Sequence, residues 1–273
     1  MSASPEDRIA GFAAALQAAE RDRAPLGEYA ISGAGLDPRG AYEVQRRIVD
    51  ARLAAGERIV GWKVGLTSKA MQEQLGVSEP DYAPILSGWF AAEGDPIGVD
   101  GLIQARVEAE IAFHLGSPLR GPGVTAMDVL AATTSVSPAI EVIDSRIGAW
   151  KIRLADTIAD LASSARVVVG AARVPVAEVD LPNVTVAFER NGEVVATGSG
   201  AAVLGDPAAA VAWAANTLGE LGVTLEAGHV VMPGAMHGSV PVAAGDTFRA
   251  VFEGLGTVTA SFTAAARPAV AAR

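Results

Sequence analysis

The chain has 273 residues, of which 50% are hydrophobic and 19% are charged, and its formal net charge is −10. This apolar content can form the core of one large domain or two small ones, and it excludes low-complexity disorder. Acidic residues outnumber basic ones by 31 to 21, which excludes a broad basic surface for nucleic acid. Cysteine is absent, so disulfides, thiolate zinc sites and cysteine nucleophiles are excluded as well.

Segments for export or membrane insertion are not expected in this sequence. The first apolar run, residues 9–16, follows acidic residues, whereas a secretory signal begins with basic ones. The longest stretch without Asp, Glu, Lys or Arg, residues 227–245, is interrupted by His, Pro and Gly. We therefore expect a soluble protein of the cytoplasm without a membrane partner.

Helical signals dominate the first third of the sequence. Pro and acidic residues open a helix predicted for about 5–21, and a second helix is predicted for about 38–55, before Gly56. Residues 58–65 (RIVGWKVG) then predict a strand, and a short helix is predicted for 69–75.

From about residue 80 onward, the pattern is mostly that of short strands separated by Gly and Pro. Residues 104–115 alternate between apolar and polar side chains, and Asn191-Gly192 is typical of a tight hairpin. A helix is predicted for 206–221 and three strands for 230–262. The fold class is therefore α+β. It consists of a mainly helical N-terminal region (1–75) and a mixed β-rich core (76–273), which we expect to form one integrated domain.

Glu108 and Glu110 are two carboxylates on one predicted strand. Alternate residues of a strand point to the same face, so these side chains are expected to lie side by side. Neighbouring carboxylates repel each other unless a cation lies between them. The same pattern also fits a solvated strand face.

Glu141 favours the cation. It lies in the apolar stretch 139–143 (AIEVI), where a buried carboxylate is costly unless it is paired or bound to a metal. Three converging carboxylates, without cysteine or paired histidines, are typical of a site for Mg²⁺ or Mn²⁺. The alternative partner of Glu141 is an arginine such as Arg146 or Arg153.

Two further polar residues are candidates for the site. Lys63 stands in an otherwise apolar strand, where it either reaches solvent or meets an anion in a pocket. Asp81 follows Pro80 and by itself indicates a turn. The three histidines show no ligand spacing, and the sequence lacks a Gly-x-Ser-x-Gly elbow and a phosphate-binding loop.

Several segments of the sequence resemble motifs of the 2-keto-4-pentenoate hydratases, a family of the fumarylacetoacetate hydrolase superfamily, and they occur in the same order as in that family. The matching segments are Ala41-Tyr42-x-x-Gln45, 61–68 (GWKVGLTS), 71–76 (MQEQLG), 79–81 (EPD), Glu108-x-Glu110, 140–146 (IEVIDSR), 156–160 (DTIAD) and 254–258 (GLGTV). Two segments depart from the family pattern. Leu161 stands where Asn is usual, and 234–238 reads Gly-Ala-Met-His-Gly where Gly-Ser-x-Thr-Arg is usual.

This resemblance implies a mixed β fold of the fumarylacetoacetate hydrolase C-terminal type around a divalent metal. It assigns Glu108, Glu110 and Glu141 to the metal ligands and places Lys63 and Asp81 beside the substrate as catalytic residues. It also makes Lys63 and Ser163 substrate-binding residues. The implied reaction is hydration of 2-hydroxypenta-2,4-dienoate to 4-hydroxy-2-oxopentanoate in the meta-cleavage catabolism of aromatic compounds, with Mg²⁺ or Mn²⁺ as Lewis acid. A homo-oligomer is also implied.

Three alternative functions stay open. A 4-oxalocrotonate (2-oxo-3-hexenedioate) decarboxylase uses the same type of metal site but needs a second anion pocket for its dicarboxylate. An acylpyruvate-type hydrolase needs a water-activating acid and base, often His with Glu, which we cannot place in the sequence. A non-catalytic subunit that associates with a paralogous decarboxylase or hydratase is the third, although the three glutamates together with Lys63 argue against a dead site.

Overall fold

The first two helices begin at side chains that cap them. In the computed structural model, which describes residues 4–69, 72–73, 77 and 79–265, α1 spans Pro5–Asp22 and α2 spans Pro38–Ala54. The side chain of Ser4 accepts a hydrogen bond from the backbone of Asp7, and that of Asp37 accepts one from Gly40. Each helix also has a proline in its first turn, where a backbone N–H would have no partner within the helix, so the missing N–H of proline costs no hydrogen bond. Both predicted helices are therefore confirmed.

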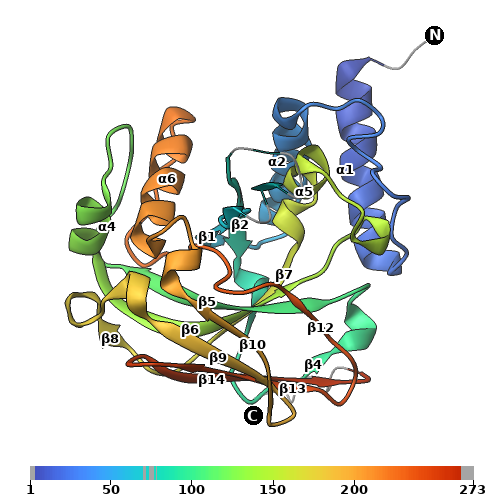
Figure 1. Cartoon of the computed structure of the whole chain (residues 1–273). Helices are drawn as coiled ribbons and strands as arrows, with labels where there is room; N and C mark the ends of the chain where they lie inside the picture. Colours follow the sequence, from blue (N-terminus) through green and yellow to red (C-terminus); the bar gives the residue numbers. More distant parts are fainter. Residues whose placement is uncertain (1–3, 70–71, 74–76, 78, 266–273) are drawn as a thin grey trace.

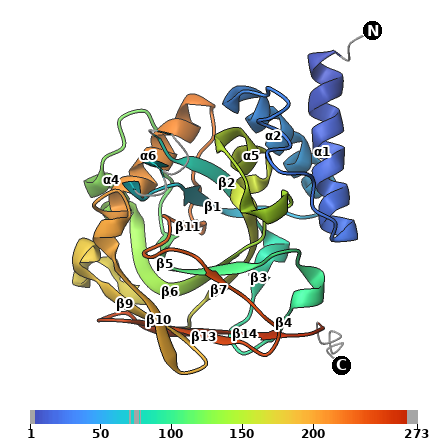
Figure 2. The same cartoon turned by 45° about the vertical axis from the view of Figure 1, so that its right-hand side comes forward.

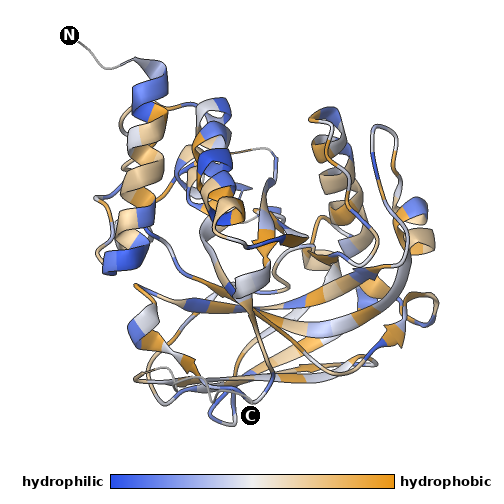
Figure 3. Cartoon of the chain, turned by 180° about the vertical axis from the view of Figure 1, so that it is seen from behind, coloured by the Kyte–Doolittle hydropathy of each residue, from blue (hydrophilic) through white to orange (hydrophobic). Residues whose placement is uncertain are grey.

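These helices pack together with α5 (Leu154–Ala159) against one end of the larger sheet (Figures 1 and 2). Their buried faces share one apolar cluster, which includes Leu16 of α1, Val44 of α2 and Ile158 of α5. Figure 3 shows the corresponding mixture of apolar and polar positions along each helix. Burial of the apolar stripe, rather than helix propensity alone, stabilises such short elements.

The larger sheet has nine strands within the described residues. Its main path runs β2-β1-β11-β5-β6-β7-β3, while β12 pairs with β5 and β8 pairs with β6. The bounds are β1 (Ile59–Gly65), β2 (Asp81–Leu86), β3 (Phe90–Ala91), β5 (Arg106–Leu115), β6 (Thr133–Ile143), β7 (Ser164–Val169), β8 (Val174–Pro175), β11 (Val230–Met232) and β12 (Val240–Pro241). The longest ladder joins β5 to β6 and is antiparallel, so these two strands form the middle of the fold.

A smaller sheet of five strands lies against the larger one and closes the core (Figures 1 and 2). Its order is β10-β9-β13-β14-β4, with β4 (Ile97–Gly98), β9 (Thr185–Arg190), β10 (Glu193–Ser199), β13 (Thr247–Phe252) and β14 (Gly256–Thr263). Asn191 and Gly192 both have positive φ between β9 and β10, which confirms the predicted hairpin. On the other side of the larger sheet lie α4 (Ala126–Ala132) and α6 (Pro207–Glu220), which pack together (Figure 1).

The α+β fold class is confirmed, with corrections at particular elements. The C-terminal segment holds four strands rather than three, because Val240–Pro241 forms the short β12. The helix predicted for 69–75 falls largely outside the described residues. Both faces of β5 are buried, since helices and loops cover one face and the smaller sheet covers the other. No helix in the described part of the chain is long and apolar enough to cross a membrane.

Candidate active site

The β5–β6 ladder brings the three predicted carboxylates together. Glu108 and Glu110 lie on the same face of β5, and Glu108 is directly opposite Glu141 of β6. Each carboxylate offers one oxygen, and these oxygens lie within 4.8 Å of one another. The side chains are buried, with Glu108 6% and Glu110 1% exposed, so the alternative of a solvated strand face is wrong.

The chemistry of this cluster suits a hard divalent cation. Like charges directly opposite one another destabilise a ladder unless a counter-ion lies between them. Glu108 Oε1 and Glu141 Oε2 are buried without a hydrogen-bond partner among the described residues, whereas Glu110 Oε2 accepts a hydrogen bond from the backbone N–H of Gly234. Carboxylate oxygens are the ligands that Mg²⁺ and Mn²⁺ prefer. The three glutamates therefore fit such an ion.

Burial also sets the ionisation of the cluster. Desolvation, reinforced by the charge of Glu141, raises the pKa of Glu108 to about 7. The same two causes raise the pKa of Glu110 well above its ordinary value. A bound cation stabilises the ionised form of carboxylates around it, so cation binding at this cluster would release protons.

Lys63 neutralises part of the cluster's charge. It lies on β1, its Nζ is 3.0 Å from Glu141 Oε1, and it donates a hydrogen bond of 2.9 Å to the carbonyl of Ala162. Burial opposes its positive charge, but the neighbouring carboxylates, with Glu141 first, raise its pKa. The partner of Glu141 is thus a lysine. The alternative of an arginine partner is wrong, since Arg146 pairs with Asp160.

Asp81 lines the same cavity and has one buried oxygen without a hydrogen-bond partner in the described residues. It begins β2, and its Oδ2 accepts a hydrogen bond of 3.0 Å from the hydroxyl of Thr157, while Oδ1 is buried with no partner in the described residues. Gly65 leaves room for it on β1, because a Cβ there would lie 2.1 Å from Oδ1. Desolvation raises the pKa of Asp81, although Lys63 and Thr157 act in the opposite direction. Asp81 is therefore more than the turn residue that its local sequence indicates.

A cavity of about 570 Å³ contains all of these groups. Ser163 also lines it, with its hydroxyl donating to Asp160 Oδ2 over 3.2 Å. The structure thus gathers Lys63, Asp81, Ser163 and the three glutamates around one space. Their roles in metal binding, catalysis and substrate binding stay predictions.

Arg106 is a lining residue that the sequence analysis did not single out. It lies two positions before Glu108 on the same face of β5, so the strand alternation that identified the glutamates also indicates its position. Its guanidinium donates to the hydroxyl of Ser239 over 2.6 Å and lies 5.9 Å from the ring centre of Trp150. The cavity therefore holds a second positive charge, at a half-buried side chain.

Residues 235–238 of the segment 234–238 line one wall of the cavity. Met236 donates its backbone N–H to the carbonyl of Ala109, and the N–H of Ala109 donates to Nε2 of His237 over 3.2 Å. The other ring nitrogen of His237 lies 2.8 Å from the carbonyl of Gly238. Because Nε2 accepts a hydrogen bond, the proton sits on Nδ1 and both nitrogens are engaged. His237 is thus held as a structural residue, which argues against its use as a general base.

Comparison with known proteins finds a family model and several relatives that agree with one another. Residues 64–263 match the family model described as fumarylacetoacetate (FAA) hydrolase C-terminal. The chain is 43% identical to a 2-keto-4-pentenoate hydratase of Burkholderia vietnamiensis over 95% of this chain and 99% of that protein. It is 44% identical to a 2-hydroxyhexa-2,4-dienoate hydratase of Comamonas testosteroni over 82% and 85% of the two chains.

A solved structure is similar over nearly the same extent. It is the 4-oxalocrotonate decarboxylase from Pseudomonas putida G7, complexed with magnesium and adipate, with a TM-score of 0.90 and 38% identity over 96% of this chain and 99% of that one. The buried carboxylate cluster, the paired sheets and the matched family model agree with one another. The chain belongs to the fumarylacetoacetate hydrolase C-terminal family.

Proposed function

We propose that this protein is a divalent-cation-dependent hydro-lyase that adds water to 2-hydroxypenta-2,4-dienoate and forms 4-hydroxy-2-oxopentanoate in the meta-cleavage catabolism of aromatic compounds. The observation that carries the proposal is the buried cluster of Glu108, Glu110 and Glu141 beside Lys63 and Asp81 in one cavity. Hydratases among the relatives, at 43% and 44% identity, support the choice of reaction.

In this proposal the three glutamates hold Mg²⁺ or Mn²⁺. When bound, the ion supplies a Lewis acid toward the oxygens of a 2-oxo or 2-hydroxy acid. Lys63 adds a fixed positive charge beside the cluster, because its ammonium is held between Glu141 and the carbonyl of Ala162. This charge favours the binding of an anionic substrate in a cavity that four carboxylates would otherwise make strongly negative.

Asp81 is proposed to move the protons of the reaction. The substrate must lose the proton of its 2-hydroxyl group and gain protons at carbon when the diene is consumed and water is added at C4. Burial raises the pKa of Asp81, which favours the protonated carboxyl that such a transfer needs, and Oδ1 of Asp81 has no hydrogen-bond partner among the described residues. Thr157 fixes the other oxygen and thereby the direction of Oδ1.

Decarboxylation of 4-oxalocrotonate is the second candidate function. It is favoured by the likeness to the Pseudomonas putida decarboxylase and by Arg106, which offers a second cation for a dicarboxylate. An acylpyruvate-type hydrolase is less favoured, because His237 has both ring nitrogens bonded. A non-catalytic subunit is disfavoured by the complete set of charged groups in the cavity.

One experiment separates the hydratase from the decarboxylase. Purified protein is stripped with a chelator and assayed by ultraviolet absorbance on 2-hydroxypenta-2,4-dienoate, with and without added Mg²⁺. Mg²⁺-dependent loss of the dienol absorbance, with 4-hydroxy-2-oxopentanoate as the product, supports the hydratase. No loss of the dienol absorbance, together with carbon dioxide release from 4-oxalocrotonate, replaces the hydratase by the decarboxylase.

We further propose a cytoplasmic homo-oligomer that can associate with a paralogous decarboxylase or hydratase.

A further inference from the structure

A short turn beside the cavity has an unusual backbone. The three consecutive residues of η4 (Leu161–Ser163) all have left-handed conformation, with φ of 57° at Leu161, 49° at Ala162 and 53° at Ser163. Residues with a Cβ rarely adopt this conformation, and a run of three is less favourable still. Such a turn persists only where its surroundings hold it in place.

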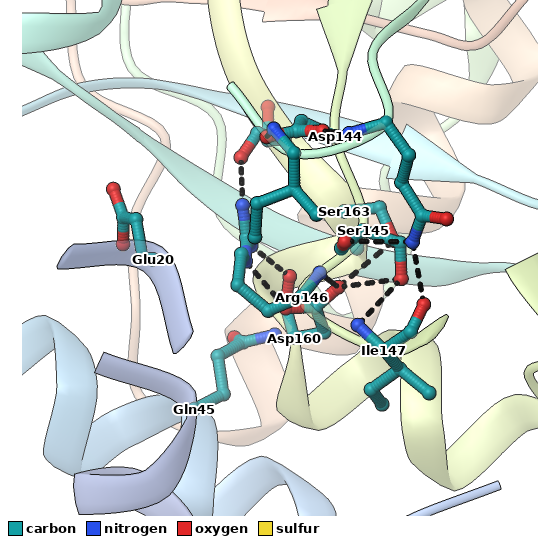
Figure 4. A network of polar contacts seen from close by, with 12 residues as sticks. Glu20, Gln45, Asp144, Ser145, Arg146, Ile147, Asp160 and Ser163 are labelled. Carbon is teal, nitrogen blue, oxygen red and sulfur yellow. Dashed lines mark hydrogen bonds and ion pairs between the residues drawn. The ribbon is translucent and has the colours of Figure 1, made fainter. Parts of the chain in front are cut away.

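The buried ion pair of Arg146 and Asp160 holds it. Arg146 Nε lies 2.5 Å from Asp160 Oδ1, and the backbone N–H of Arg146 donates to Oδ2. The hydroxyls of Ser145 and Ser163 donate to the same Oδ2, each over 3.2 Å (Figure 4). Arg146 also donates to the carbonyls of Asp160 and Ser164, at the two ends of the turn. The turn is thereby fixed to the segment that follows β6.

The turn and the residue that follows it contact the two members of the Lys63–Glu141 pair. The carbonyl of Ala162 accepts a hydrogen bond of 2.9 Å from Lys63 Nζ. The hydroxyl of Ser164, the next residue after the turn, donates to Glu141 Oε1 over 2.7 Å, and the same Oε1 is 3.0 Å from Lys63 Nζ. Glu141 Oε2 has no partner among the described residues. One oxygen of Glu141 is therefore held, and the other is left for a ligand.

We propose that the Arg146–Asp160 pair, the left-handed turn and Ser164 after it act as a positioning unit that orients Glu141 toward the bound cation and holds Lys63 in place. The inference rests on the proposed role of Glu141 as a metal ligand. Groups that hydrogen-bond to a metal ligand fix its orientation, and their loss weakens metal binding by about 10- to 100-fold. Leu161 also gains an explanation here. The Asn expected at this position tolerates left-handed backbone. Leu161 does not favour that backbone, but its side chain is 1% exposed and packs in the apolar cluster beside α5, which offsets the cost.

The test compares two substitutions of Leu161 that keep a buried apolar side chain of similar volume. Leu161→Ile introduces a branch at Cβ, which disfavours left-handed backbone, whereas Leu161→Met does not. The affinity of the chelator-stripped protein for Mg²⁺ alone is measured by calorimetry, and kcat and KM are measured separately. We expect the Mg²⁺ Kd to rise about 10-fold in Leu161→Ile, with a lower kcat, and to stay within about 2-fold in Leu161→Met.

Two more variants distinguish positioning from general destabilisation. Ser164→Ala removes only the hydroxyl on Glu141, and we expect it to raise the Mg²⁺ Kd about 10-fold with a small change in Tm. Val44→Ala, on α2 in the same apolar cluster, is expected to lower Tm and leave the Mg²⁺ Kd unchanged. Wild-type Mg²⁺ affinity in both Leu161→Ile and Ser164→Ala would overturn the proposed positioning unit and leave the proposed function standing. A wild-type chain that binds no divalent cation would overturn the ligand role of Glu141, and with it both proposals.

Discussion

Lys63 and Glu141 form an ion pair of 3.0 Å with side chains only 5% and 1% exposed, and both residues line the cavity that also contains Asp81. A buried ion pair is costly to form unless additional hydrogen bonds complete it. Here Ala162 and Ser164 provide those bonds. The arrangement leaves one oxygen of Glu141 without a partner in the described structure, and several predictions of function depend on that oxygen and its neighbours.

Glu108→Gln tests the cation site directly. The amide has nearly the shape of the carboxyl that burial already favours, so we expect Tm without metal to be unchanged or higher. Addition of Mg²⁺ raises the Tm of the wild type, and this increase is expected to be lost in the variant, together with roughly 100-fold or more of the activity. Thermal melts with and without Mg²⁺ check it, with Glu193→Gln on the exposed part of β10 as control. An intact Mg²⁺ response would remove Glu108 from the ligand set.

Asp81→Asn tests the proton-transfer role. The amide can still accept the hydrogen bond from Thr157 but cannot exchange a proton, so we expect kcat to fall by about 10²- to 10⁴-fold. Mg²⁺ affinity and KM are expected to change little. Thr157→Val leaves the carboxyl but frees its direction, and a loss of about 10-fold in kcat is expected. Steady-state kinetics on the dienoate decide the matter, and a kcat within 2-fold of wild type in Asp81→Asn would contradict the role.

Arg106→Met tests whether the second cation of the cavity contacts the substrate. We expect KM to rise about 10- to 100-fold, because a charge-assisted hydrogen bond to a carboxylate is lost, with a smaller change in kcat. Arg106→Lys keeps the positive charge but not the planar guanidinium, so we expect its KM to lie between those of the wild type and Arg106→Met. Measurement with both 2-hydroxypenta-2,4-dienoate and 4-oxalocrotonate adds a comparison. A rise confined to the dicarboxylate would assign Arg106 to its distal carboxylate, and unchanged KM for both would exclude contact.

Gly234→Ala combines two costs at one position. Gly234 has φ of 120°, and a Cβ there would lie 2.0 Å from Thr67 Oγ1. We expect a loss of about 2 kcal/mol or more in the free energy of unfolding, and weaker Mg²⁺ binding because the N–H of Gly234 holds Glu110. Gly238→Ala in the same segment is the matched control, since a Cβ there meets nothing within 4 Å. Equal stability of the two variants would refute this account.

The pH dependence of stability should include a contribution from His114. Burial lowers the pKa of its imidazole from 6.5 to about 4, so the fold favours the neutral ring. The ring lies 3.0 Å from the hydroxyl of Ser137, which itself donates to a carbonyl. The stability from the neutral ring is complete above pH 6.5 and is lost as the pH falls toward 4. We expect Tm to fall less over this range in His114→Gln, and identical Tm profiles would contradict the assignment.

The sequence predicted the helix ends and the hairpin turn, which depend on residues close together in the chain. The caps of α1 and α2 and the Asn191-Gly192 turn lie where the sequence places them, because each depends on residues a few positions apart. Alternation on one strand likewise predicted that Glu108 and Glu110 share a face. That β5 is buried on both faces could not be predicted, since it depends on which elements cover the sheet.

Other features depend on contacts between distant segments. Lys63 and Glu141 are paired across the fold, and the local sequence around Glu141 offered only an arginine as the alternative to a metal ion. The left-handed turn at Leu161 has no local signal at all, because leucine does not favour that backbone. The ion pair of Arg146 and Asp160, 14 residues apart, and the burial of the Leu161 side chain explain it. These are the places where tertiary contacts override local preference.

The register that places Glu108 opposite Glu141 also links the site to the order in which the protein folds. Two of the carboxylates come from one strand and the third from its neighbour, so the cation-binding geometry exists only once the β5–β6 ladder has formed in the correct register. A slip of one residue would turn Glu108 and Glu110 to the opposite face together. A bound ion would thus slow amide hydrogen exchange most strongly along these two strands, because opening the ladder would also release the ion.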